Sequence, residues 1–204
     1  HGQNGRYGRT RTQVGYDLDT DRKMRDENLR PDNIFRQTLF GVPIVQQWCD
    51  LWLWEQVFEQ TPELKGVIEL GTLKGGLSLF LRLQTMQRGQ RFCTVDWVDY
   101  LTPCPLFDVV DLAGQRLEID MWVGEGWKTL TEMLADDAWH PLLLLCDGGN
   151  KPKEVQTFAP LLRPGDIIAV HDWNTEFGPA DLAPVEHLLA PVARDGLRLM
   201  TGLF

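Results

Sequence analysis

Short apolar runs alternate with segments of helical periodicity through the middle of this chain. The runs are expected to be strands, and they cover 66–70, 91–96, 117–123, 141–146 and 167–170. After the first run, Leu77, Phe80 and Leu81 recur at helical spacing. Continuous apolar strands are typical of parallel sheets that are covered on both faces. The pattern therefore predicts an α/β protein with a doubly wound, mostly parallel sheet between two layers of helices.

A Trp-rich segment precedes the first expected strand. Over 43–60 the apolar residues, among them Trp48, Trp52 and Trp54, indicate an amphipathic helix with a wide apolar face. These tryptophans are candidates for a substrate pocket or a subunit interface, and core packing is the alternative. Additional helices are expected over 127–134 and from residue 152 onward.

The chain has 204 residues, and we expect one domain over 34–204. Residues 1–33 mix charged and polar side chains without sustained hydrophobic periodicity. This composition predicts an N-terminal arm that is mobile or ordered only by contacts with the rest of the protein. At the other end, 197–204 supplies one expected strand.

Charge and composition narrow the classes of partner. The sequence has 20 Lys and Arg against 29 Asp and Glu, for a formal net charge of -9, which opposes an extended nucleic-acid interface. It shows no apolar run of membrane-spanning length and no signal-peptide pattern, so we expect a soluble, cytoplasmic protein without a membrane partner. Its 4 cysteines lack the spacing of a disulfide framework or a metal site. A small-molecule substrate is the expected partner, and the Trp-rich helix leaves a homo-oligomer open.

A glycine-rich turn follows the first expected strand. The stretch from Glu69 to Ser78 reads ELGTLKGGLS, an acid and then glycines that lead into a helix. Gly71 would let the chain turn without a Cβ clash, while Gly75 and Gly76 would bring backbone N–H groups close to a ligand. The positive end of the following helix would face a ligand carboxylate. The alternative is a tight strand-to-helix turn of the kind that any α/β protein contains.

Asp96 ends the second expected strand. In doubly wound folds a carboxylate at this place can accept both ribose hydroxyls of a nucleoside, and an ordinary solvated acid is the alternative. Glu69 at the first strand strengthens the nucleoside hypothesis. The glycine spacing differs from the GxGxxG pattern of a pyrophosphate clamp, so a nicotinamide cofactor is the lesser alternative. After the third strand, Glu125 is a candidate for contact with the base, or else a surface acid.

Acidic residues also follow the fourth and fifth expected strands. Asp147 comes after the apolar run 141–146, and His171 and Asp172 follow 167–170. Ligands bind at the carboxyl edge of an open α/β sheet, near the point where the strand order reverses. If Asp147 and Asp172 lie within several ångströms of each other, their oxygens would suit a bridging Mg²⁺ ion.

These motifs together resemble a known family. The segments GVPIVQQWCD at 41–50, ELGTLKGGLS at 69–78, DGGN at 147–150 and VHDW at 170–173 are similar to the cephalosporin hydroxylase and rhamnosyl O-methyltransferase-like branch of class I methyltransferases. The resemblance implies a Rossmann-like fold that binds S-adenosylmethionine. The cofactor-binding residues it implies are Glu69, Gly71, Thr72, Gly75, Gly76, Ser78, Asp96, Glu125 and Asp147. The implied ligands of a Mg²⁺ ion are Asp147, His171 and Asp172.

The sequence departs from the pattern of that family at two site positions. Related enzymes often carry a histidine three residues beyond the fourth-strand acid as general base, whereas this chain has Asn150, which cannot accept a proton at neutral pH. Where some relatives have a second acid before the fifth-strand aspartate, this chain has His171, a less suitable Mg²⁺ ligand. The candidate catalytic residues are therefore Asp147, Lys151 and His171. Lys151 would need a lowered pKa to act as a base, and a solvated lysine is the alternative.

The leading hypothesis is an S-adenosylmethionine-dependent O-methyltransferase that acts on a small hydroxylated molecule, such as a sugar or a secondary metabolite. A metal would assist by binding the acceptor hydroxyl and lowering its pKa. The rivals are an NAD- or nucleotide-binding oxidoreductase and a non-catalytic scaffold that binds S-adenosylmethionine. Asn150 is the feature that keeps the scaffold hypothesis open.

Overall fold

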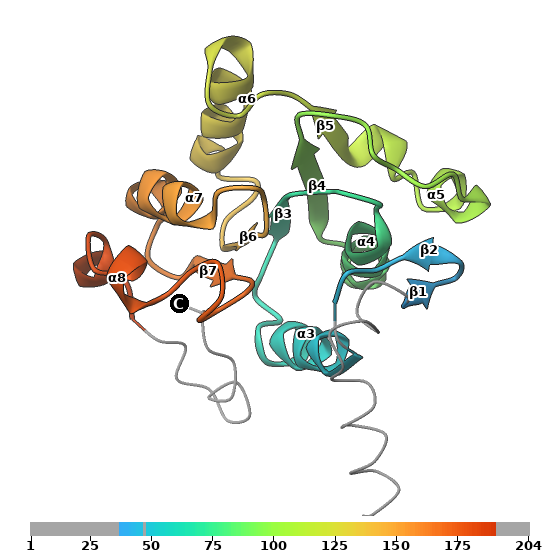
Figure 1. Ribbon diagram of the computed structural model, residues 1–204, viewed down its shortest axis with the longest axis horizontal. Helices are drawn as coiled ribbons and strands as arrows, with labels where there is room; N and C mark the ends of the chain where they lie inside the picture. Colours follow the sequence, from blue (N-terminus) through green and yellow to red (C-terminus); the bar gives the residue numbers. More distant parts are fainter. Residues whose placement is uncertain (1–36, 47, 191–204) are drawn as a thin grey trace, which may run out of the picture.

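The computed structural model describes residues 37–46 and 48–190, with the backbone alone at 48 and 49 (Figure 1). The expected arm at 1–33 and the expected strand at 197–204 lie outside the described residues, so the domain limits remain predictions. Within the described part, no helix combines the length and the apolar character that crossing a bilayer requires.

A five-stranded parallel sheet forms the centre of the fold, with strand order β5-β4-β3-β6-β7. The strands are β3 (Gly66–Leu70), β4 (Arg91–Asp96), β5 (Arg116–Glu118), β6 (Leu142–Cys146) and β7 (Ile167–Val170). All residues of β3, β6 and β7 are buried, as expected for parallel strands covered on both faces. The predicted doubly wound α/β sheet is confirmed.

The third strand is shorter than the predicted 117–123. β5 pairs with β4 only over Arg116–Glu118. Two residues later the side chain of Asp120 accepts a hydrogen bond from Trp122 N at 2.9 Å. This Asx-type turn bends the chain away from the sheet, because the aspartate satisfies the backbone that a continued strand would pair.

Helices cover both faces of the sheet and make two separate apolar cores. Figure 1 shows α3 (Trp48–Gln60) and α4 (Gly76–Arg88) on one side, and α6 (Gly124–Ala135), α7 (Lys151–Phe158) and α8 (Pro179–Leu182) on the other. Residues alternate between the cores along each strand, so that Val67 faces the α3 side and Ile68 the α7 side. The predicted three-layer α/β/α architecture is confirmed. The remaining elements are β1 (Thr38–Leu39), β2 (Val42–Pro43), α5 (Pro105–Val109) and the 3₁₀ turns η1 (Ala113–Gln115), η2 (Ala159–Leu161) and η3 (Glu186–Leu188).

Two helix boundaries differ from the prediction. The Trp-rich helix begins at Trp48, because Pro43 belongs to β2, which forms a hairpin with β1. Its Trp54 is 4% exposed in the core, whereas Trp52 is 54% exposed. The helix expected over 127–134 begins three residues earlier, at Gly124.

The strand order reverses between β3 and β6, and the two chain segments approach closely beyond their carboxyl ends. Gly71 has φ +103°, and a Cβ atom at this position would lie 2.4 Å from the carbonyl oxygen of Asp147. Asp147 N donates to Leu70 O at 3.0 Å, which continues the ladder of hydrogen bonds past the strand ends. Gly71 therefore provides both the left-handed turn and the space that Asp147 needs at this edge.

A buried hydrogen-bonded pair that the sequence analysis missed anchors the opposite edge of the sheet. His140 Nδ1 lies 2.8 Å from Asp166 Oδ1, and His140 Nε2 lies 2.8 Å from Leu134 O. The carboxylate of Asp166 also accepts hydrogen bonds from Leu142 N at 2.9 Å and Arg163 N at 2.7 Å. Asp166 thus joins the start of β6, the loop before β7 and α6.

The Asp166→Ala variant should lower the free energy of unfolding by about 3 kcal/mol, because the buried groups around Asp166 would lose their acceptor. Chemical denaturation of purified protein measures this change. Asp137→Ala is the control, because Asp137 is 93% exposed and pairs with Arg163 at the surface. Equal unfolding midpoints for the two variants would contradict the anchoring role.

Candidate active site

Two adjoining cavities open at the carboxyl edge of the sheet. One, of about 500 Å³, lies beyond β4, β5 and β6, and we call it the β4 cavity. The other, of about 370 Å³, lies beyond β6 and β7 against the start of α3 and α4, and we call it the β7 cavity. Gly71, Leu73 and Asp147 line both. The cavities therefore meet where the strand order reverses, the usual ligand site of open α/β sheets.

The β4 cavity has largely apolar walls, and the carboxylate of Asp96 is fixed at its rim. Asp120, Asp147 and Glu154 also line it. Asp96 Oδ2 accepts a hydrogen bond from Leu73 N at 3.0 Å, and Oδ1 accepts one from Trp97 N at 2.8 Å. These bonds hold the carboxylate at the rim with lone pairs left for a ligand. The apolar and aromatic residues of the wall are Leu73, Val95, Trp97, Tyr100, Ile119, Met121 and Trp122.

The predicted glycine turn borders the β7 cavity. Gly71, Thr72, Gly75 and Gly76 all line it, and Gly75 adopts a left-handed conformation with φ +84°. Gly76 has a further role, since a Cβ atom there would lie 2.3 Å from Pro43 O. The turn thus lies tightly between the cavity and the end of β2, at Pro43 and the following Ile44.

Three predicted cofactor residues line neither cavity. Glu69 and Ser78 are fully buried, and Ser78 Oγ donates a hydrogen bond to Glu69 Oε2. Burial raises the pKa of Glu69 to about 8, although hydrogen bonds from Ser78 and Thr94 oppose the rise. Glu125 is exposed on α6, where it pairs with Lys128 at 3.0 Å. Glu69 and Ser78 therefore join the end of β3 to the start of α4 inside the core. Glu125 lies away from both cavities.

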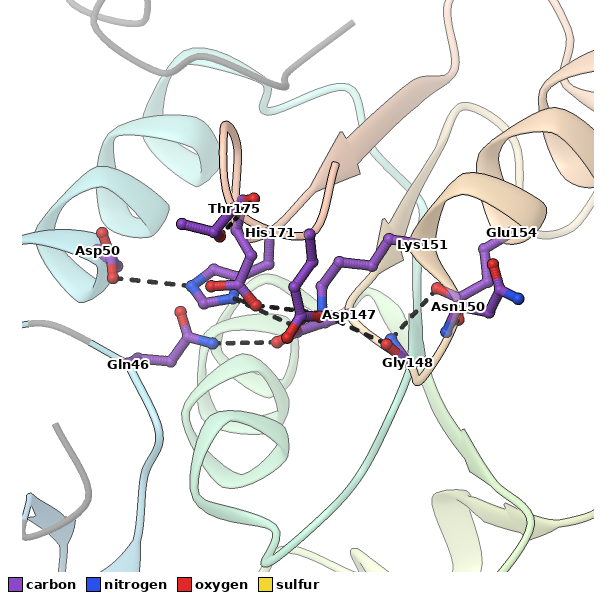
Figure 2. Close-up of polar contacts among 11 residues, drawn as sticks. Gln46, Asp50, Asp147, Gly148, Asn150, Lys151, Glu154, His171 and Thr175 are labelled. Carbon is purple, nitrogen blue, oxygen red and sulfur yellow. Dashed lines mark hydrogen bonds and ion pairs between the residues drawn. The ribbon is translucent and has the colours of Figure 1, made fainter. Parts of the chain in front are cut away.

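The predicted acids after β6 and β7 meet in the β7 cavity. Figure 2 shows the side chains of Asp147, Lys151 and His171 pointing toward one another. His171 Nδ1 lies 3.2 Å from Asp147 Oδ1 and 3.2 Å from Asp172 Oδ2. Asp172 has φ +60°, in the left-handed region that residues other than glycine seldom adopt. Residues in such conformations are frequent at functional sites.

Lys151 is buried among these acids rather than solvated. Its side chain is 4% exposed, and Nζ lies 3.1 Å from Asp172 Oδ2, 3.5 Å from Asp147 Oδ1 and 2.7 Å from Glu176 Oε2. Lys151 is the first residue of α7. The preceding residue, Asn150, caps that helix by accepting a hydrogen bond from Lys153 N at 3.1 Å.

The charges of the cluster stabilise one another. Burial disfavours the charged form of His171, but hydrogen bonds to Asp147 and Asp172 outweigh it and raise the pKa of His171 to about 12. The hydrogen bond from His171 likewise lowers the pKa of Asp172 to about 2. Burial also opposes the charge of Lys151, yet its pairing with Glu176 and Asp147 raises the Lys151 pKa above its ordinary value. The lowered pKa that a Lys151 base would need is therefore not found, and both groups are cations at neutral pH.

The cluster offers a ligand set for a divalent cation. One ligand atom each from Asp147, His171 and Asp172 lies within 4.8 Å of the other two. Carboxylate oxygens suit Mg²⁺, and the imidazole would have to give up a proton to join them. The spacing and the carboxylates would suit the ion, but the ammonium of Lys151 already contacts both carboxylates.

Three further residues of this cavity were missed by the sequence analysis. Gln46 is 3% exposed and donates from Nε2 to Asp147 Oδ2 at 3.0 Å. Asp50 Oδ2 lies 4.0 Å from His171 Nε2 (Figure 2). Glu176 pairs with Lys151. Gln46 and Asp50 lie within the segment 41–50 that carries part of the family resemblance, which was the available signal. Their position at the cavity depends on how α3 packs against the sheet.

The Glu69→Gln variant should change how stability depends on pH. Between pH 4.5, the ordinary pKa, and about 8, the folded chain keeps the Glu69 proton that the unfolded chain has lost, so wild-type stability falls as pH rises. A neutral amide removes this contribution. The difference in unfolding free energy, variant minus wild type, should therefore increase by at least about 2 kcal/mol between pH 5 and pH 8. Denaturant titrations at both pH values check this, with exposed Glu125→Gln as the control. Parallel pH profiles for wild type and Glu69→Gln would contradict the expectation.

Comparisons with known proteins identify the fold. No family model and no curated protein matches the sequence. A structure of CmcI with Mg and SAM superposes with a TM-score of 0.53 at 16% identity, covering 80% of this chain and 68% of that chain. A CmcI structure with SAH gives a TM-score of 0.50 at 17% identity, covering 80% of this chain and 79% of that chain. At this identity the likeness establishes the fold alone, and the predicted Rossmann-like α/β/α fold is confirmed.

Proposed function

We propose that this protein is an S-adenosylmethionine-dependent O-methyltransferase that acts on a small hydroxylated molecule, such as a sugar or a secondary metabolite. The observation that carries the proposal is the junction of the two cavities at Gly71 and Asp147. A methyl donor in one cavity and an acceptor in the other would meet there. The likeness to CmcI structures named for Mg–SAM and SAH agrees with this assignment.

The β4 cavity fits the nucleoside part of the donor. Asp96 would accept hydrogen bonds from the ribose hydroxyls, and Trp97, Met121 and Trp122 would pack against the base. Gly71, where a side chain would clash with Asp147, leaves the junction open for the donor's reactive end. When bound, S-adenosylmethionine supplies a methyl group that is already activated on a sulfonium. The protein then has to orient the acceptor and remove its proton.

The β7 cavity supplies groups for the acceptor. As the acceptor oxygen bonds to the methyl carbon, the electron pair of the carbon–sulfur bond stays on sulfur, and the hydroxyl proton must leave. Asp147 is the carboxylate at the junction, and we assign it as the proton acceptor. Lys151 and His171, both held at Asp147 Oδ1, provide positive charge beside the oxygen that loses its proton. In this proposal each of the predicted catalytic residues, Asp147, Lys151 and His171, has a role.

If Lys151 moved away from Asp147 and Asp172, a magnesium ion would be held by these two residues and His171, whose ligand atoms are close enough to share it. Its chemistry would be Lewis-acid polarisation of the acceptor hydroxyl, which lowers the pKa of that group. Without the metal ion, the positive charges of Lys151 and His171 would also lower the pKa of the acceptor hydroxyl.

The Asp96→Ala variant should bind S-adenosylhomocysteine about 5- to 150-fold more weakly than wild type, because the ribose would lose a charged acceptor. Isothermal titration calorimetry measures the affinity. Asp99→Ala serves as the control, since Asp99 is exposed and pairs with Arg116 outside the cavities. Wild-type protein that binds NAD but not S-adenosylhomocysteine would replace this proposal with the oxidoreductase alternative.

The Asp147→Asn variant should lose methyl transfer by about 100-fold or more, and lose less of its S-adenosylhomocysteine affinity, because an amide cannot take the proton. Transfer of a radiolabelled methyl group to a panel of sugars and phenols is the measurement, with Asp108→Asn on α5 as the control. Undiminished transfer by Asp147→Asn would remove Asp147 as the base. Wild-type protein that binds the donor product but methylates nothing in the panel would favour a non-catalytic scaffold.

A further inference from the structure

The ammonium of Lys151 and the imidazole of His171 contact the same two carboxylate oxygens. Lys151 Nζ lies 3.5 Å from Asp147 Oδ1 and 3.1 Å from Asp172 Oδ2. His171 Nδ1 lies 3.2 Å from each of these atoms. A divalent ion bound by Asp147 and Asp172 would need oxygens that already have a cationic partner.

The fold keeps Lys151 in this position. Its side chain is 4% exposed, and it extends from the first residue of α7, whose start is fixed by the Asn150 cap and by Pro152. Nζ also lies 3.3 Å from Gly148 O and 2.7 Å from Glu176 Oε2. A buried ammonium without partners would be unfavourable, and these acceptors offset that cost. Because the cation is part of the chain, its local concentration at the carboxylates is high at any bulk ionic strength.

Charge balance makes a third cation unfavourable while Lys151 stays in place. Asp147, Asp172 and Glu176 carry the negative charge nearest to Nζ. Mg²⁺ requires near-octahedral oxygen ligands and would bring two further positive charges within a few ångströms of the ammonium. Binding of the ion therefore requires Lys151 to move away from Asp147 and Asp172.

We propose that Lys151 is the internal cation of this cluster: it occupies the place between Asp147 and Asp172 that a divalent metal would take and competes with that metal for both carboxylates. The wild-type cluster is then assembled without a metal, and its affinity for Mg²⁺ or Mn²⁺ is weak. Removal of the ammonium converts the same residues into a metal site. This inference does not depend on methyl transfer, because it concerns the metal alone.

The test is a titration of purified full-length protein with MnCl₂ and MgCl₂, in the absence of donor and acceptor. Lys151→Met keeps an unbranched side chain of similar length without the charge, and it should bind Mn²⁺ at least about tenfold more tightly than wild type. Lys153→Met is the matched control, because Lys153 lies on the same helix with its ammonium over the Trp122 ring and should leave the affinity unchanged. Adding Asp147→Asn to Lys151→Met should abolish the gain.

Thermal unfolding with and without Mn²⁺ gives a second readout, which also applies if the loss of Lys151 weakens the fold. Mn²⁺ should raise the melting temperature of Lys151→Met and Lys151→Gln more than that of wild type, because the ion would replace the missing charge. Equal or weaker Mn²⁺ affinity in Lys151→Met, or no greater stabilisation by Mn²⁺, would overturn the proposal. Failure of wild-type protein to bind S-adenosylhomocysteine would instead affect only the proposed function.

Discussion

The close approach of two backbone segments, at Gly71 and Asp147, is the constraint on which the candidate site depends. A Cβ atom at position 71 would lie 2.4 Å from the carbonyl oxygen of Asp147, so only glycine fits there. Backbone hydrogen bonds continue the sheet at this edge, from Gly71 N to Val95 O at 2.8 Å and from His171 N to Cys146 O at 3.2 Å. The side chains after β3, β6 and β7 are therefore fixed relative to one another by the ladder of the sheet. A larger residue at position 71 would separate the segments between which the two cavities meet.

The charged cluster beyond β6 and β7 depends on this arrangement of the strand ends. Asp147 receives Gln46 on one oxygen and both Lys151 and His171 on the other. Each charge in this set is stable in a partly buried place because its opposite is next to it. Loss of Asp147, Lys151 or His171 would leave the others with an uncompensated charge, so these three residues act as one unit.

The two positions at which the motifs differ from the family they resemble have clear roles in the structure. Asn150, where the resembled family often has a histidine, caps α7 and so fixes the helix start at Lys151. His171, in the place of a second acid, brings a proton and a positive charge to the carboxylates. The cluster thus carries its own cations, Lys151 and His171, beside Asp147 and Asp172.

The positions of the strands, and the edge of the sheet at which the site lies, follow from local patterns in the sequence. The apolar runs 66–70, 91–96 and 167–170 became strands with those limits, because strand burial on both faces requires local runs of apolar residues that a single sequence displays. Asp96, Asp147, His171 and Asp172 were predicted to lie at the carboxyl edge, and they do, because parallel strands end on one side. Which polar residues meet at that edge depends on how the helices and loops pack around it. Gln46 and Asp50 reach the cluster because α3 packs near β7, Glu69 lies beneath the glycine turn rather than in a cavity, and Lys151 is buried among acids. These outcomes depend on contacts between residues far apart in the chain, and on the mutual compensation of their charges, neither of which is encoded in local spacing.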